Sequence, residues 1–173
     1  MDLDPGSFRD PSGQVFSHAN TIYRSIFKPG VRDYEHVRDE GIYDKLIRKG
    51  LLLPHEQTKI QAFCPKETLY CLSYQKIPLV SYPWEWSFSM LKDAALIHLD
   101  MMEILVPEGF WLRDANAFNV QFDGSSLKMI DTLSIGRRMK DTPWIGYQQF
   151  CAHFLAPLTL AAFRDIRMLS LWI

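Results

Sequence analysis

Apolar and polar positions along the chain follow first a strand-like and then a helix-like period. The early apolar residues predict two short strands, at 15–16 and 21–27, which a break at 28–30 should end. A helical spacing then covers 33–49, with acidic residues first and basic residues last, the order that suits the helix dipole. Gly41 predicts a break within this helix.

A second β-rich section follows the helix, for which Gly50 is the predicted carboxyl-terminal cap. Residues 60–63, 68–74 and 76–82 have the pattern of extended structure. Pro78 argues against a long central strand here, because proline cannot donate to a sheet ladder.

Two longer helices are predicted in the second half. The first, capped by Ser87 or Ser89, is apolar on most sides and therefore belongs in the middle of a core. Pro107 ends it. The second runs from about 144 to 164 and is interrupted or kinked at Pro157.

The densest aromatic cluster of the chain lies just before the first of these helices. It can be core at the seam between two subregions, which general burial tendencies favour, or one wall of a ligand pocket. The cluster consists of Tyr82, Trp84, Trp86 and Phe88.

The stretch 111–135 has the clearest local pattern. Alternation over 120–123 predicts a half-buried strand, and Asp123-Gly124 is a strong hairpin turn signal. A return strand over 127–130 ends at Asp131.

This hairpin places polar groups at both of its ends. Asp114 and Asn119 lie in the loop that enters it, and Asp131 lies at its exit. Their side-chain oxygens can converge on a hard cation such as Mg²⁺. Each of these residues is also an ordinary turn former, so capping loops are the alternative interpretation.

Composition describes an ordinary globular chain of 173 residues, with 47% apolar and 23% charged residues. That length fits one domain with a real core. The formal net charge of −1 gives no general attraction to nucleic acid or to an anionic membrane. We therefore expect no nucleic-acid partner.

Cysteine usage and the amino terminus favour a cytoplasmic protein. The three cysteines lack metal-ligand spacing and are expected to be reduced. The first ten residues carry acids where a signal peptide has bases, and no run is long enough to span a membrane. We expect no membrane partner.

The succession of buried helix, Arg113-Asp114, Asn119, hairpin and Asp131 resembles the catalytic segment of protein kinases and small-molecule phosphotransferases. The resemblance implies Mg²⁺ and ATP as cofactors. It gives Asp114 the catalytic role of base or orienter for an accepting hydroxyl, and it makes Asn119 and Asp131 metal ligands.

The kinase pattern is incomplete. Leu112 stands where protein kinases carry histidine, Asn116 where they carry lysine, and Thr132-Leu133 replaces Phe-Gly. The first half contains no G-x-G-x-x-G loop.

The cation that would bind phosphates is also not marked by a motif. Arg24 and Lys28 are the candidates for this cofactor-binding role, with Glu35 or Glu40 as the acidic partner.

Several longer strings resemble the amino-terminal region of a bacterial family of SAM-dependent methyltransferases, or nodulation-related proteins. They are LDPGSFRDPSGQVF, SYPWEWSFSMLKDAALIHLD, DANAFNVQF, MIDTLSI and YQQFCAHFLAPL. Members of that family are longer, with the methyltransferase domain after this region, so the implied partner is a carboxyl-terminal methyltransferase domain absent here. The chain has no glycine-rich SAM loop, and SAM is implied only through that domain.

These observations predict an α+β, kinase-like fold. A small strand-rich subregion over 1–83 precedes a helical subregion over 84–173 that carries the β-hairpin. The apolar end of the chain suggests a truncated domain, in which exposed apolar surface can drive self-association. Three functions remain open: an accessory module that binds nucleotide, metal or the partner domain's substrate, an active Mg²⁺-dependent phosphotransferase, and a structural docking or dimerisation domain.

Overall fold

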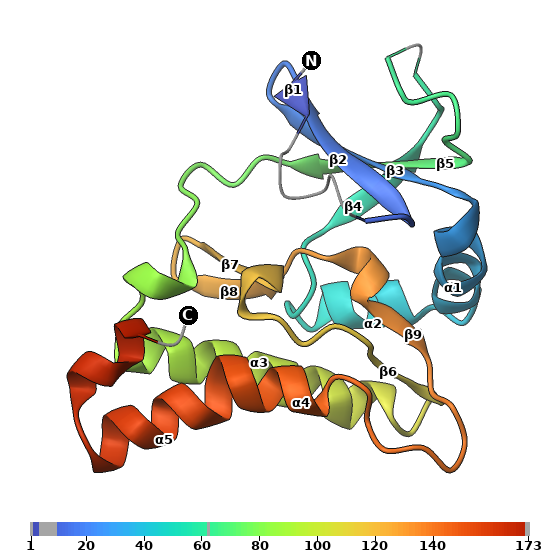
Figure 1. Cartoon of the computed structure of the whole chain (residues 1–173). Helices are drawn as coiled ribbons and strands as arrows, with labels where there is room; N and C mark the ends of the chain where they lie inside the picture. The colour runs from blue at the N-terminus through green and yellow to red at the C-terminus, as the bar shows by residue number, and fades with distance from the viewer. Residues whose placement is uncertain (1, 4–9, 62, 172–173) are drawn as a thin grey trace.

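In the computed structural model, which describes residues 2–3, 10–61 and 63–171, the first half of the chain is organised around one antiparallel sheet. Figure 1 shows this sheet above the helical part, with strand order β1-β2-β3-β5-β4. Its strands are β1 (Asp2–Leu3), β2 (Gly13–His18), β3 (Thr21–Ile26), β4 (His55–Thr58) and β5 (Tyr70–Gln75).

The helices α1 (Lys28–Asp39) and α2 (Ile42–Arg48) follow β3 directly. The break expected at 28–30 does end the strand, but it also opens α1, because proline is tolerated in the first turn of a helix. Gly41 separates the two helices in a left-handed conformation, with φ of 68°. This confirms the predicted break.

Gly50 ends α2 as the sequence predicts. Its φ is 73°, its N–H donates to Ile47 at 2.9 Å, and the N–H of Leu51 donates to Leu46 at 3.0 Å. These two bonds form a Schellman motif, which satisfies carbonyls that the helix end would otherwise leave free.

The long helix α3 (Phe88–Leu105) begins at Ser87, whose hydroxyl accepts a hydrogen bond from the N–H of Met90 at 3.3 Å. Leu91, Met101 and Leu105 are fully buried. The opposite face is exposed, with Leu96 at 46% and Leu99 at 41%, so α3 packs on the core through one face and the prediction that it lies in the middle of the core is wrong.

The predicted hairpin is present as β7 (Val120–Asp123) and β8 (Ser126–Met129), after a 3-10 turn at Ala117–Asn119. Gly124 has φ of 62°, the turn conformation that glycine allows at little cost. Met129 exchanges two backbone hydrogen bonds with the 51–53 segment, each 2.8 Å long. These bonds join the hairpin to the chain that leads into β4.

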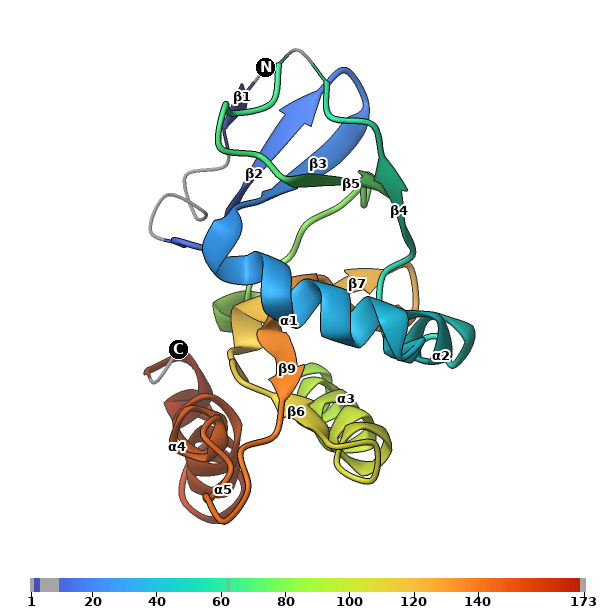
Figure 2. The same cartoon turned by 90° about the vertical axis from the view of Figure 1, so that its right-hand side faces the viewer.

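A second small ladder was not predicted from the sequence. The strands β6 (Phe110–Leu112) and β9 (Ile135–Arg137) pair antiparallel on either side of the hairpin. Figure 2 shows β9 running beneath α1, against which it packs.

The last predicted helix is divided into α4 (Tyr147–Phe150), a π-helical turn (Cys151–Leu155) and α5 (Ala156–Phe163). The π turn lies directly before Pro157, which cannot donate to the helix ladder. The chain then continues into a 3-10 segment, Ile166–Leu171. The predicted interruption at proline is confirmed.

The extended section between the helices was placed wrongly in part. Residues 59–61 and 63–69 form no strand, and 76–82 is an irregular linker; β4 lies earlier, at the polar segment His55–Thr58. The sequence of 4–13 is also rich in turn-forming residues; 4–9 lie outside the described residues, and 11–12 form a turn. The α+β class itself is confirmed, with an antiparallel sheet above a mainly helical layer.

Candidate ligand-binding site

A cavity of about 820 Å³ lies between the five-stranded sheet and the hairpin. Its upper wall comes from β2, β3 and β5, one side comes from the 75–80 linker, and its floor comes from 113–121 and 130–134. Pockets that hold cofactors and drug-sized ligands have volumes of roughly 300–1,000 Å³. The cavity is therefore large enough for a nucleotide.

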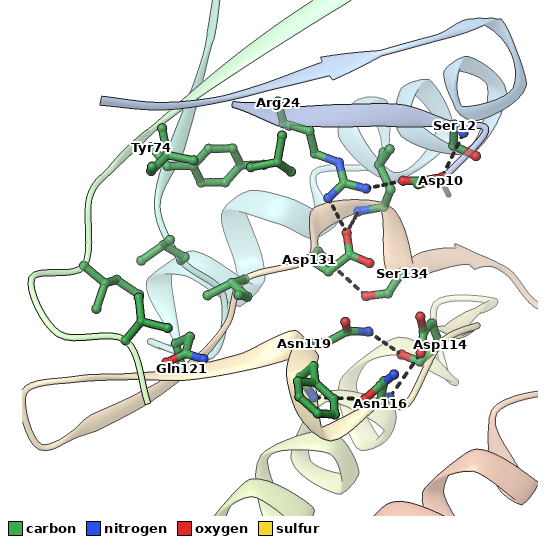
Figure 3. A pocket seen from close by; sticks show the side chains of 18 of the residues that line it. Asp10, Ser12, Arg24, Tyr74, Asp114, Asn116, Asn119, Gln121, Asp131 and Ser134 are labelled. Carbon is green, nitrogen blue, oxygen red and sulfur yellow. Dashed lines mark hydrogen bonds and ion pairs between the residues drawn. The ribbon is translucent and has the colours of Figure 1, made fainter. Parts of the chain in front are cut away.

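Four of the five site residues predicted from the sequence line this cavity. They are Arg24, Asp114, Asn119 and Asp131. Figure 3 shows Arg24 reaching down from the sheet towards Asp131, with Asn119 and Asp114 below. Lys28, by contrast, is exposed in the first turn of α1 and does not line the cavity.

Arg24 is held between two carboxylates. Its guanidinium forms ion pairs with Oδ1 of Asp131 at 2.9 Å and with Oδ2 of Asp10 at 2.7 Å. Burial lowers the pKa of Arg24, but nearby negative charge, above all that of Asp131, outweighs burial and raises it. Arg24 is therefore a permanent cation, although its side chain is only 11% exposed.

The acidic partner expected for this cation was assigned wrongly. Glu35 instead accepts a hydrogen bond from the hydroxyl of Tyr70, and Glu40 lies 3.5 Å from Arg137 on the surface. The acidic partner of Arg24 is instead Asp10, which lies just before β2. Its other carboxylate oxygen accepts the N–H of Ser12 at 2.8 Å.

Asp131 caps the short turn that follows the hairpin. The N–H of Leu133 donates to its carboxylate at 3.1 Å, and the hydroxyl of Ser134 donates to its backbone carbonyl at 2.7 Å. Burial raises the pKa of Asp131, while Arg24 and the Leu133 N–H oppose this rise. These bonds point the carboxylate at the cavity.

The loop that carries Asp114 and Asn119 is closed by its own side chains. The carboxylate of Asp114 accepts the N–H of Asn116 at 3.1 Å, and the amide of Asn119 donates to the backbone carbonyl of Asp114 at 3.5 Å. The N–H of Ile130 then donates to the backbone carbonyl of Asn119 at 2.8 Å. This last bond fixes the loop relative to the neighbouring Asp131.

Arg113 connects the same loop to α1. It forms an ion pair with Asp33 at 2.6 Å and donates to the backbone carbonyl of Leu133 at 2.9 Å. Its side chain also covers Gly136, where an added Cβ would lie 2.7 Å from it. The position of α1 is thereby coupled to the floor of the cavity.

The side chains at the cavity can bind a metal ion only if a bound ligand supplies further oxygen atoms. Among the described residues, no group of three or more His, Cys, Asp or Glu side chains could hold a metal ion. Mg²⁺, however, is commonly bound by one or two protein ligands plus substrate phosphates and water. Asn119 and Asp131 can supply the protein share of such a site.

None of the four residues of the aromatic cluster lines the cavity, so the structure does not support the pocket-wall interpretation. Trp86 is buried in the core, with 4% of its surface exposed, whereas Tyr82 and Trp84 stack on one another at the surface, 4.6 Å apart. Phe118, 5.6 Å from the Trp84 ring, continues this surface and lines the cavity. Of these surface aromatics, only Phe118 belongs to the lining of the cavity.

Two lining residues carried no signal in the sequence. Gln121 is buried and binds Ser81 of the linker through two hydrogen bonds, at 3.1 and 2.8 Å. Tyr74 is also buried, and its hydroxyl lies 2.6 Å from that of Thr132. The first contact joins residues 40 positions apart and the second residues 58 positions apart, and local sequence patterns do not indicate such pairings.

The cysteines are free, as expected. Cys71 is buried, while Cys64 and Cys151 are partly exposed. His98 is buried in α3, where its Nδ1 lies 2.7 Å from the carbonyl of Ala94, and burial lowers its pKa to about 4. It is a neutral core residue.

The fold and site define a mixed α+β protein with a ligand-sized cavity between an antiparallel sheet and a helical layer. No family model matches the chain. The chain is similar to Nodulation protein NoeA of Rhizobium meliloti (strain 1021), with 37% identity over 163 residues. The match covers 93% of this chain and 34% of NoeA, so the chain spans about a third of that relative's length. This similarity supports the nodulation-related part of the family resemblance.

A membrane-spanning helix is not found over residues 2–3, 10–61 and 63–171, because none of the helices there is both long and apolar enough.

Proposed function

We propose that this chain is a kinase-like module that binds a nucleotide together with Mg²⁺ in the cavity beneath the sheet. The observation that carries the proposal is the meeting of Arg24, Asn119 and Asp131 at one cavity from two parts of the chain. In a longer protein of the nodulation-related type, the module would serve a partner domain with methyltransferase activity.

The chemistry of the cavity supports a nucleotide. Its charged groups include Arg24 and Asp131, and the aromatic ring of Tyr74 lies beside Arg24 (Figure 3). Apolar side chains from both walls, Ile22 and Ile130 among them, complete the lining. A nucleotide needs both kinds of surface, because its base is planar and largely apolar whereas its phosphates are anionic.

The positions of the charged groups also fit the kinase arrangement. Arg24 lies on a strand that a helix follows, as the phosphate-binding lysine does in protein kinases. Asp131 follows a short hairpin, and Asn119 precedes it. Arg24 would bind phosphate oxygens, and the two oxygen ligands would hold Mg²⁺ against them.

The proposal is tested by thermal unfolding of the chain with and without Mg²⁺-ATP. A ligand present at ten times its Kd stabilises the folded state by about 1.4 kcal/mol, which raises Tm by about 3–5 °C for a domain of this size. The shift should be lost in Asp131→Asn and kept in Asp93→Asn, which removes one exposed carboxylate from α3, away from the cavity. An absent shift in the parent at millimolar ligand would refute nucleotide binding.

Phosphoryl transfer is a second candidate, favoured by Asp114. Its carboxylate lines the cavity and is held by the backbone of its own loop, so it is placed to accept a proton from a hydroxyl bound there. Turnover of Mg²⁺-ATP that is lost in Asp114→Asn, with nucleotide binding retained, would establish this role. Equal turnover in both proteins would exclude it.

Docking is a third candidate, favoured by apolar side chains exposed near the end of the chain. Leu155, Phe163 and Ile166 are 51%, 83% and 59% exposed. Such surface on a second copy of the chain could pair with it. Sedimentation of the parent as a dimer and of Phe163→Asp as a monomer would support self-association, and a monomeric parent would not.

A further inference from the structure

The segment just before β2 places a carboxylate on the cation of the proposed ligand site. Asp10 lies 2.7 Å from Nη2 of Arg24, on a different nitrogen from the one that Asp131 contacts. The third nitrogen of the guanidinium, Nε, is buried and has no partner among the described residues. Both terminal nitrogens of the guanidinium are thus paired with the protein's own anions.

The two carboxylates are not anchored equally. Asp131 accepts the backbone N–H of Leu133 and lies directly after the hairpin, which is bonded through Met129 to the 51–53 segment. Asp10 makes its other hydrogen bond to Ser12, two residues away in the same turn, and its side chain is 31% exposed against 21% for Asp131. Of the two anions, Asp10 can leave Arg24 with the smaller rearrangement.

A phosphate group entering the cavity would meet this carboxylate. Phosphate and carboxylate oxygens bind a guanidinium in the same way, through charge-assisted hydrogen bonds along one edge. Two anions cannot share that edge without repulsion, because like charges in contact at a half-buried site oppose one another. A phosphate that binds Nη2 of Arg24 would therefore displace Asp10 from it.

We propose that Asp10 is a built-in competitor that occupies the phosphate position on Arg24 and must be displaced when a phosphate-bearing ligand binds. The inference rests on the proposed function for the identity of the natural ligand. The competition itself concerns any phosphate anion that reaches Arg24. As a consequence, the affinity of the site for phosphate is lower than it would be if Arg24 had no ion pair with Asp10.

The test measures pyrophosphate binding by calorimetry at low ionic strength, with EDTA present so that no metal contributes. Asp10→Asn keeps the shape of the side chain and its bond to Ser12 but removes its charge. Removal of a partly exposed ion-pair partner should tighten pyrophosphate binding about three- to fivefold. The control is Asp93→Asn, which changes the net charge equally at an exposed position of α3 and should leave the affinity within twofold of the parent.

A second variant assigns the gain to Arg24. In an Arg24→Gln background, Asp10→Asn should no longer tighten binding, because the cation for which the two anions compete is gone. If Arg24→Gln does not fold, as circular dichroism would show, the comparison of Asp10→Asn with Asp93→Asn decides the question alone.

The outcomes separate this inference from the proposed function. Equal pyrophosphate affinity in the parent, Asp10→Asn and Asp93→Asn, including no binding in all three, overturns the competitor role. Weaker binding in Asp10→Asn overturns it as well, since Asp10 would then support the ligand. Tighter binding of pyrophosphate by Asp10→Asn, in a protein that shows no Tm shift with Mg²⁺-ATP, would refute the nucleotide proposal and leave the competition standing.

Discussion

Removal of Arg24 should destabilise the protein more than removal of either carboxylate that it holds. In Arg24→Met the side-chain volume is nearly kept, but Asp131 and Asp10 lose their shared cation. Breaking a buried ion pair from one side costs about 3–5 kcal/mol, because a charge is left buried without compensation. In Asp131→Asn the cation keeps Asp10, and the lost charge-assisted bond costs about 1.5–3 kcal/mol.

The cost of Arg24→Met should also depend on pH. Burial already raises the pKa of Asp131, and the loss of Arg24 removes the main force that opposes this rise. A folded pKa raised above the unfolded value gives stability that is present at low pH and is lost as pH rises through the folded pKa. Arg24→Met should therefore be less destabilised at pH 5 than at pH 7.5.

Urea unfolding followed by tryptophan fluorescence measures both effects, since Trp86 and Trp111 are buried. The double variant Arg24→Met with Asp131→Asn should be more stable than Arg24→Met alone, because it leaves one buried charge fewer. A cost for Arg24→Met that is no larger than that of Asp131→Asn, or that is the same at both pH values, would refute the reasoning.

Three further predictions concern the frame around the cavity. Burial lowers the pKa of His98 to about 4, below its unfolded value near 6.5. Its contribution to stability is therefore present above pH 6.5 and is lost as pH falls towards 4, by about 3 kcal/mol in all. Urea titrations at pH 7 and 4.5 should show a smaller loss of stability in acid for His98→Gln than for the parent. Gln121→Ala should cost about 1–3 kcal/mol, because it frees two backbone groups of Ser81, and it should change the fluorescence of Trp86, whose indole N–H donates to the Ser81 hydroxyl at 2.9 Å. Gly50→Ala should lower the free energy of unfolding by about 1–2 kcal/mol, because its φ of 73° is unfavourable for alanine, and an unchanged urea midpoint would contradict this.

Elements whose cause is local could be predicted from the sequence. The hairpin β7–β8 follows from strict alternation around Asp123-Gly124, and α3 follows from an apolar surface on most sides of one helical run. The cap at Gly50 follows from a glycine placed directly after a helical pattern. In each case the residues that determine the structure lie within one or two turns of each other.

Elements created by distant pairing could not be predicted. Strand β4 (His55–Thr58) has an entirely polar sequence and is a strand because it pairs antiparallel with β5 at the edge of the sheet. The three-residue strands β6 and β9 are too short to show a period, and they pair only because the hairpin between them brings their ends together.

The same distinction applies to the candidate site. Asp114, Asn119 and Asp131 could be proposed because they lie within one short stretch whose spacing resembles a known arrangement. Arg24 could be proposed only as one of two nearby cations. Asp10, which pairs with Arg24, is 14 residues away in the sequence. Their contact depends on the turn before β2 and on the pairing of β2 with β3, which the sequence around Asp10 does not indicate.

The part of the fold that carries each site residue also determines how the site responds to a ligand. Asn119 and Asp131 are fixed to one another by the backbone bond to Ile130, so the floor of the cavity moves as one unit. Arg24 and Asp10 belong to the sheet side, and they meet the floor through the single ion pair between Arg24 and Asp131 at 2.9 Å and through the lining of the cavity. The sheet also reaches the floor through the hydrogen bond between Tyr74 and Thr132, and a ligand that bridges phosphate at Arg24 and metal at Asn119 and Asp131 would add a further link. Binding should therefore stabilise the sheet relative to the hairpin, and hydrogen exchange in β2 and β3 should slow more than exchange in β7 and β8 when the ligand is added.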